Sequence, residues 1–517
     1  MYKLLLKLKT LAFGILAIFF SLMWVLTLLL HGWAAPFPRL TPQKPLLLLG
    51  LAFIFFIYLM LVNRLSLVFV KKQQKKFIGW TLFFYTVFQI VFVVLFPVNA
   101  FEDAVIVNNI ALQFLEGNYN SLGIGSYLGY YPNNIGITIF FAFLYSFLPD
   151  SNLTLRLVNV LFNTVSAWLI YKIYIELYPE KGKKAYGVLL LSVTFLPAVI
   201  MNNFTYGDIC CNTFCLAAIL NALRFTRTGL GKYALSTALF LMGANFMRSV
   251  AFLFMAAILL YWVLNHQPQT KYNLKNVAYT GLVVILFNLP LKLFSFVGVK
   301  TGIIVEPVGI HANPVWRWIN MGFPGKKLGY WDGGRNIAIF VNRFKCDKHA
   351  ASKYFIREIA ENYRNNGLLN VFKAYFKKTF WLWTEGTYSV NFYGLSQALR
   401  ADKFMLYSTP FIKLIEPWDW KVRLSLNWLL HSFNWLVLGL VSLYLFDAIK
   451  KRDFRMELFV YIIYFYIGFY MLWEVKSRYI FGVYPIFLIM GYHYSHIIYS
   501  KLFHRHKPLI NRASHDI

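Results

Sequence analysis

The chain has 517 residues, of which 59% are hydrophobic, 19% aromatic and only 14% charged. Soluble globular proteins carry roughly 25% charged residues, so this composition excludes an ordinary soluble domain and points to lipid. Lysine and arginine number 51 against 21 acidic residues, but most of the basic residues fall in short tracts between apolar runs. That distribution follows the positive-inside rule of membrane proteins and makes a nucleic-acid partner the weaker interpretation of the net charge.

The N-terminal part of the chain predicts three membrane spans. Residues 11–30, 46–62 and 78–97 are apolar runs of about the length that a bilayer requires. Lysines precede the first run, and a strongly basic tract, residues 63–76, precedes the third. Basic segments stay in the cytoplasm, so we expect the N-terminus inside and the loop after the third run outside.

That outer loop begins with two adjacent carboxylates, Glu102 and Asp103. No Lys or Arg occurs between Phe77 and Leu155, which is typical of a non-cytoplasmic segment. An acidic pair at a membrane interface is costly unless it is used or paired, so this pair marks a candidate functional site. Further on, residues 135–148 are apolar but too short for a span, and we expect them to form a helix along the outer face.

The later apolar runs alternate between the two faces, and the basic turns between them mark the cytoplasmic side. Further spans are expected at residues 153–174, 185–201, 209–223, 233–246, 250–264, 277–296, 426–446, 458–472 and 479–499. Residues 298–424, between the expected spans at 277–296 and 426–446, form a polar and aromatic segment. Within it, residues 348–365 and 370–383 have helical spacing.

The predicted fold is therefore an all-α polytopic membrane protein with about 12 transmembrane helices, external juxtamembrane helices and one long external loop. Both termini are expected in the cytoplasm. We divide the chain into an N-terminal transmembrane region (residues 1–297, including an external loop at 98–152), a long external loop region (298–424) and a C-terminal transmembrane region (425–517).

This topology gathers charged residues from separate parts of the chain at the outer face. Besides the acidic pair, they are Asp208, Arg248, His311, Asp332, Arg335, Glu474 and Arg478. Each of them taken alone is more often simply solvated, or reaches toward the headgroups. Their joint occurrence on one face favours a site.

Transfer of a sugar from a lipid phosphate is a reaction that would use these groups. The leaving phosphate calls for arginines at headgroup depth, such as Arg248 and Arg478, because a guanidinium can donate two hydrogen bonds to it. The acceptor hydroxyl needs a carboxylate general base, for which Asp103 is the candidate. Aromatic residues can stack on sugar rings or form an interfacial belt; these are Tyr130, Tyr131, Trp316, Trp318 and Trp331.

Several motifs carry a resemblance to a known superfamily. The stretch FEDAVIVNNIALQFLEGNY, followed by YYPNNIG, resembles the first external loop of the GT-C membrane glycosyltransferases, which include protein O-mannosyltransferases, aminoarabinose transferases and oligosaccharyltransferases. The positions that match their pattern are Asp103, Ala111, Gly117 and Tyr131-Pro132. MNNFTYGD, ending at Asp208, resembles their second external loop, WEVKSRY with Pro485 resembles their Glu…Arg-Tyr…Pro pattern, and HANPVWRWINMG resembles part of their long external loop.

The chain departs from these relatives in two ways. The acidic loop follows the third span instead of the first, and the pair reads Glu-Asp where many relatives read Asp-Glu. Alignment on Ala111 makes Asp103 the equivalent acid and leaves the role of Glu102 open.

The resemblance implies a glycosyltransferase that moves a sugar, with inversion, from a polyprenyl-phosphate-linked donor to a cell-envelope glycopolymer, glycolipid or protein at the outer face of the cell membrane. The catalytic candidates are Asp103 and Glu102. The substrate-binding candidates are Asp208, Arg248, Tyr131, His311, Trp316, Glu474, Arg478 and Tyr479. No cofactor is indicated, although the outer acids leave a divalent metal open. The sugar, the acceptor and the choice between monophosphate and diphosphate donors are not indicated either.

The main alternative is a transporter or flippase for lipid-linked saccharides. Transporters hold their ionisable groups near the bilayer midplane, on broken helices in corresponding halves of a repeat. The charged groups here are predicted at one interface, which favours the enzyme.

Overall fold

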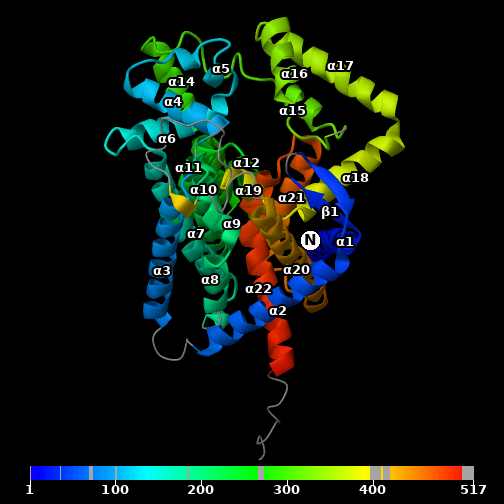
Figure 1. Cartoon of the computed structure of the whole chain (residues 1–517). Helices are drawn as coiled ribbons and strands as arrows, with labels where there is room; N and C mark the ends of the chain where they lie inside the picture. The colour runs from blue at the N-terminus through cyan, green and yellow to red at the C-terminus, as the bar shows by residue number, and fades with distance from the viewer. Residues whose placement is uncertain are drawn as a thin grey trace, which may run out of the picture.

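The computed structural model describes residues 2–34, 37–68, 74–98, 100, 102–182, 185–265, 273–325, 327–395, 409–411 and 420–503. These residues are mostly helical. Long helices form a bundle, and shorter helices crown one of its ends (Figure 1). The predicted helical class is therefore confirmed, apart from a small two-stranded sheet.

The chain begins with three long helices, α1 (Tyr2–Leu26), α2 (Pro45–Val68) and α3 (Gln74–Leu95). Between the first two, where only a loop was expected, β1 (Leu30–Trp33) and β2 (Arg39–Pro42) pair antiparallel. The tertiary structure stabilises this hairpin, because the indole of Trp381 donates to the Trp33 carbonyl at 2.8 Å.

The remaining elements follow in chain order. They are α4 (Asp103–Leu115), η1 (Asn120–Leu122), α5 (Tyr127–Tyr130), η2 (Pro132–Asn134), α6 (Ile135–Tyr145), α7 (Asn152–Leu177), η3 (Pro179–Lys181), α8 (Tyr186–Val193), α9 (Leu196–Met201), α10 (Asp208–Thr228), α11 (Gly231–Met247), α12 (Ala251–Leu264), α13 (Asn273–Phe287), α14 (Leu289–Lys300), α15 (Val315–Gly322), α16 (Gly333–Ala338), η4 (Ile339–Arg343), α17 (Lys348–Asn366), α18 (Leu368–Thr384), α19 (Val390–Tyr393), α20 (Trp420–Lys451), α21 (Glu457–Leu472), η6 (Ser477–Val483) and α22 (Tyr484–Phe503).

Within the described residues, six helices are long and apolar enough to cross a membrane, namely α1, α2, α3, α7, α10 and α20. The pair α13 and α14 adds a seventh if its 46° bend belongs to one broken span. This is fewer than the 12 runs expected from hydropathy. Two of the expected spans, α12 and α21, are apolar but shorter, and residues 185–201 are divided between α8 and α9. The chain is a multi-pass membrane protein, and the exact number of spans stays a prediction.

Two expected spans are broken at prolines. Residues 185–201 form α8 and α9, with Pro197 in the first turn of the second helix. Residues 277–296 break at Asn288, just before Pro290. Proline lacks the N–H that would continue a helix, and its ring clashes with the preceding turn. The two prolines were visible in the sequence, but the spans were predicted from hydropathy alone.

The predicted helix at residues 135–148 is present as α6, and it is largely buried. It packs against α11 so closely that a side chain at Gly136 would meet the Phe246 carbonyl. The predicted helices of the long loop region are present as well, as α17 and α18. They join at Gly367, whose φ of 71° is a conformation that glycine adopts without strain.

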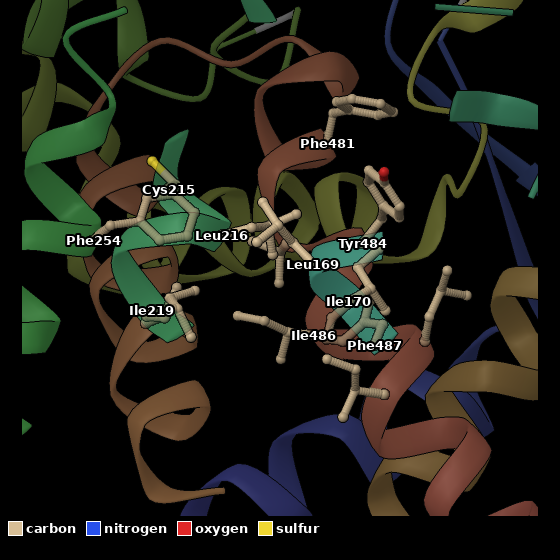
Figure 2. Close-up of a cluster of buried hydrophobic side chains, with 14 of the residues drawn as sticks. Leu169, Ile170, Cys215, Leu216, Ile219, Phe254, Phe481, Tyr484, Ile486 and Phe487 are labelled. Carbon is tan, nitrogen blue, oxygen red and sulfur yellow. The ribbon is translucent and has the colours of Figure 1, made fainter. Parts of the chain in front are cut away.

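The core that supports the site lies where α7, α10, α12 and α22 meet (Figure 2). Leu216 of α10 and Phe254 of α12 are buried there together with Phe481 of η6. The clustered cysteines, Cys210, Cys211 and Cys215, are free and buried in the same core, as small apolar residues would be. Packing beneath η6 fixes the segment that carries Arg478.

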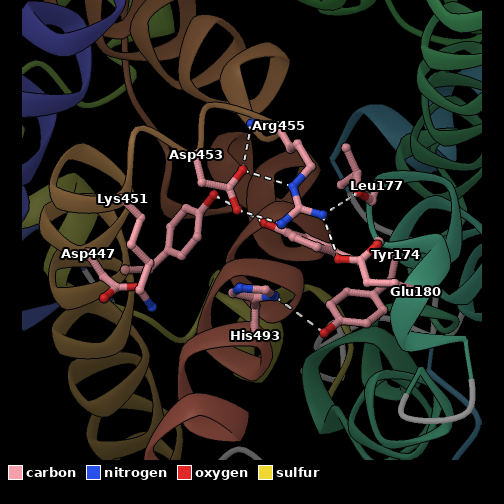
Figure 3. Close-up of polar contacts among 10 residues, drawn as sticks. Tyr174, Leu177, Glu180, Asp447, Lys451, Asp453, Arg455 and His493 are labelled. Carbon is pink, nitrogen blue, oxygen red and sulfur yellow. Dashed lines mark hydrogen bonds and ion pairs between the residues drawn. The ribbon is translucent and has the colours of Figure 1, made fainter. Parts of the chain in front are cut away.

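At the C-terminal end of α7, Arg455 connects the α20–α21 turn with the turn that follows α7 (Figure 3). Its guanidinium lies 2.6 Å from Glu180 and 2.7 Å from Asp453, and it stacks 4.0 Å over the ring of Tyr178. Arg224 and Arg227, from another of the basic turns that we expected in the cytoplasm, pair with Glu176 near the same end of α7.

Candidate functional site

A cavity of about 700 Å³ lies among the shorter helices that crown the bundle. Its walls come from the start of α4, the loop around α5, the α11–α12 turn, α15 and the segment after α21. Its charged lining residues are Glu102, Asp103, Arg248, Glu474, Lys476 and Arg478. Segments far apart in the sequence therefore contribute ionisable groups to one cavity.

Most of the site residues predicted from the sequence meet here. Those that line the cavity are Glu102, Asp103, Tyr131, Arg248, Glu474, Arg478 and Tyr479. Asp208 lies directly behind them, with its carboxylate 3.4 Å from Nη1 of Arg478. The structure brings these residues together around one cavity. Their chemical roles remain predictions.

Two of the predicted binding residues, His311 and Trp316, do not line this cavity. Asp332 and Arg335, which we also expected among the gathered charges, do not line it either, and Arg335 pairs with Glu358 at 2.6 Å. His311 pairs with Glu306 at 2.5 Å and lines a separate cavity of about 550 Å³. Trp316 is 41% exposed, whereas Trp318 on the same helix lines the site cavity and stacks on Trp473. Residues two apart on a helix do not face the same way, so only one of the two tryptophans can line one wall.

Asp103, the first residue of α4, is held by a chain of hydrogen bonds. The Tyr127 hydroxyl donates to Asp103 Oδ1 at 2.9 Å, and the Asn134 amide donates to the Tyr127 oxygen at 2.8 Å. The Tyr206 hydroxyl in turn donates to Asn134 Oδ1 at 2.9 Å. Burial raises the pKa of Tyr206, which keeps its hydroxyl protonated. Together these contacts fix the orientation of the Asp103 carboxylate through Oδ1, and Oδ2 can accept a hydrogen bond from a substrate.

Glu102 is held differently from its neighbour. Its backbone has φ 51° and ψ −135°, which costs a residue other than glycine about 1–3 kcal/mol and persists only where the surroundings enforce it. Nζ of Lys476 lies 3.2 Å from its carboxylate. The two acids of the pair thus differ in partner: a cation for Glu102 and a hydroxyl for Asp103.

The two arginines of the cavity stand against aromatic faces. The Arg478 guanidinium lies 4.5 Å from the ring centroid of Tyr393 and 4.7 Å from that of Phe204. Arg248 lies 4.4 Å from the ring centroid of Tyr206. Such faces stabilise a cation without using its N–H groups. Within the described part of the chain, Nη1 of Arg478 contacts Asp208 and its Nε is buried without a hydrogen-bond partner.

Glu474 completes the set of acids. It is buried, and the Tyr479 hydroxyl donates to its Oε1 at 2.5 Å. Burial raises the pKa of Glu474, and the nearby cations Lys476 and Arg478 offset this only in part.

Sequence reasoning did not single out Lys476, Tyr127, Asn134 and Tyr206 as site residues. A signal for Lys476 was present, because Glu474 and Lys476 are alternate residues of the short extended stretch before η6. Alternate residues of an extended segment point to one side. The other three act through contacts across loops, which spacing does not reveal.

In the part of the chain that the structure describes, no group of three or more His, Cys, Asp or Glu side chains is arranged to hold a metal ion. The site acids instead have the cation and hydroxyl partners described above.

Residues 135–291 match the family model described as dolichyl-phosphate-mannose-protein mannosyltransferase. The matched region runs from α6 into α14 and contains Asp208 and Arg248. The searches of curated proteins and of solved structures found no match. That family is part of the GT-C superfamily, so the matched region identifies a membrane glycosyltransferase of the GT-C type and confirms the resemblance that the motifs indicated.

Proposed function

We propose that this protein transfers a sugar, with inversion, from a polyprenyl-phosphate-linked donor to a glycopolymer, glycolipid or protein at the outer face of the cell membrane. One observation carries the proposal above the others. A single cavity of about 700 Å³ holds an oriented carboxylate, Asp103, together with three cationic side chains, Arg248, Lys476 and Arg478. Base and cations in one space are what transfer from an anionic leaving group requires.

The roles follow from the chemistry of the step. Asp103 accepts the proton of the acceptor hydroxyl while that oxygen attacks the anomeric carbon of the donor sugar. The bond from this carbon to the phosphate oxygen breaks, and its electron pair leaves with the lipid phosphate. Arg478 and Arg248 stabilise the phosphate by charge-assisted hydrogen bonds. Attack opposite the leaving group inverts the anomeric centre.

The aromatic walls supply a place for the sugar ring. Trp318 and Trp473 stack with centroids 5.8 Å apart and planes 13° apart, and both line the cavity. Trp331 and Tyr131 line it too. A flat aromatic wall beside the carboxylate orients a sugar by contact with its apolar face, which brings the reacting atoms together.

The proposed topology has about 12 spans, with both termini in the cytoplasm and the cavity outside. Two features support this orientation. The basic Arg455 turn contacts Leu177, the last residue of α7, at the end of the bundle opposite to α4, α5 and α6 (Figure 1). The loop that begins with Glu102 and Asp103 contains no lysine or arginine before Arg156.

The test uses the full chain in lipid vesicles with a panel of labelled polyprenyl-phosphate sugars. We expect the release of polyprenyl phosphate to depend on an added acceptor and to be lost in Asp103→Asn. A flippase would instead move the intact donor across the bilayer without breaking the sugar–phosphate bond. Movement of the donor without cleavage, equal in the wild type and in Asp103→Asn, would contradict the proposal.

A further inference from the structure

The segment that follows α21 contributes several neighbouring residues to the cavity wall. Its members Trp473, Glu474, Lys476, Arg478 and Tyr479 all line the cavity. The segment is extended before η6 begins, and it pairs with the loop before α16 through one bridge, Tyr330 with Val475. The Val475 N–H donates to the Gly329 carbonyl at 2.9 Å. A segment with so little regular pairing needs other contacts to fix its register.

One end of this segment is held by a buried lysine of α18. Lys378 is 0% exposed, and its Nζ donates to the carbonyls of Gly322 at 2.6 Å, Met471 at 3.0 Å and Trp473 at 2.6 Å. These carbonyls belong to the C-terminal ends of α15 and α21, where the helix dipole favours a cation. Burial lowers the pKa of Lys378 to about 7, but three acceptors favour the charged form, which alone carries three N–H groups.

Two glycines leave room for the ammonium group of Lys378 between the surrounding backbone segments. A Cβ at Gly329 would lie 2.6 Å from the Gly322 carbonyl oxygen and 3.1 Å from Nζ of Lys378. A Cβ at Gly322 would lie 2.1 Å from the Leu472 carbonyl oxygen. Glycine at both positions therefore lets three chain segments close around one lysine.

The other end of the segment is held from the same helix face. The Ser477 hydroxyl donates to Glu385, which is 1% exposed and also accepts from the Thr387 N–H at 2.9 Å. Glu385 follows Lys378 by seven positions, which is two helical turns and about 10 Å. The stretch from Trp473 to Ser477 spans about 13 Å when extended. The distance between Lys378 in α18 and Glu385, which caps the end of that helix, is thus similar to the distance between their partners.

We propose that Lys378 and Glu385 are positioning residues for the transfer reaction. Neither lines the cavity; together they hold the segment from Trp473 to Ser477 in the register that presents Glu474, Lys476 and Arg478 to it. The inference rests on the proposed function for its catalytic consequence, and its structural consequence is measurable without any activity.

The first experiment measures hydrogen exchange of the amides of residues 473–478, by mass spectrometry on the full chain without substrate. Lys378→Met keeps the length and removes the donors. We expect exchange at least tenfold faster there, because three buried carbonyls lose a charged partner. Lys377→Met is the matched control: this neighbour on α18 is exposed, and we expect no change. Unchanged exchange in folded Lys378→Met would overturn the inference.

The second experiment measures donor KM and kcat in the same variants. We expect Lys378→Met to raise the donor KM and lower kcat, roughly tenfold or more in kcat/KM, while Lys377→Met matches the wild type. A wild-type kcat/KM in Lys378→Met would overturn the catalytic part. If Lys378→Met does not fold, Ser477→Ala tests the other anchor, with faster exchange of the same amides expected. Faster exchange in a protein whose wild type transfers no sugar would contradict the proposed function and leave the positioning contacts supported.

Discussion

The hydroxyl of Tyr127 donates a hydrogen bond of 2.9 Å to the carboxylate of Asp103, joining two residues 24 positions apart. The same hydroxyl accepts from Asn134, so its hydrogen is directed to the carboxylate. This pair distinguishes Asp103 from the adjacent Glu102, which faces Lys476. The geometry favours Asp103 as the group with an oxygen available to an acceptor hydroxyl.

The first prediction separates these two acids. Asp103→Asn keeps the shape and removes the basicity, so we expect transfer to fall by about 10²–10⁴, the range typical of a lost general base. Donor binding should survive, because the cations remain. Glu102→Gln should be milder, since it alters a partner of Lys476 and leaves the base intact. Initial rates with a labelled polyprenyl-phosphate sugar check both; abolished transfer in Glu102→Gln with normal transfer in Asp103→Asn would reverse the assignment.

The second prediction concerns the orientation of the base. Tyr127→Phe removes the donor to Asp103 and leaves the ring in place. A hydrogen bond to a charged group contributes about 1.5–3 kcal/mol, so we expect kcat to fall about tenfold or more. The unfolding temperature should change little. Tyr119→Phe, in the same loop but outside the cavity lining, serves as the control. An equal loss in both variants would point to the loop and away from the hydrogen bond.

The third prediction concerns the proposed phosphate contact. Arg478→Ala removes a charge-assisted hydrogen-bond donor worth about 1.5–3 kcal/mol, so both donor affinity and kcat should fall. Arg478→Lys should rescue only part of the loss, because an ammonium cannot form the two parallel hydrogen bonds of a guanidinium. Donor titration and single-turnover rates measure the two effects separately. Full activity in Arg478→Ala would exclude this arginine from phosphate binding.

The fourth prediction tests the orientation in the membrane. Single cysteines at Asn120 and at Lys327, close to Gly329, should react with a membrane-impermeant thiol reagent added outside intact cells. Cysteines at Gln74 and Lys451 should react only after the membrane is opened. The four natural cysteines are buried and should give little background. Reaction at position 74 from outside would reverse the topology and place the cavity in the cytoplasm.

The sequence contained enough to predict the long apolar helices and the two helices of the long loop region, because each depends on properties that add up along one segment. Residues 78–97 and 153–174 coincide with α3 and α7, and residues 348–365 coincide with α17. The distribution of lysine and arginine between the apolar runs predicted in addition that the candidate acids and arginines lie on the same face of the bundle. Hydropathy was a poorer guide where prolines break a run, at Pro197 and Pro290.

Only the tertiary structure decided which of the candidate residues share the cavity. Trp318 and not Trp316 faces it, and His311 lies in a separate cavity, because the rotation and docking of α15 and its preceding loop depend on their neighbours. The contacts of Lys378 reach 56 positions to Gly322 and 95 to Trp473. Contacts over such separations form after the helices pack, and no property of one segment encodes them.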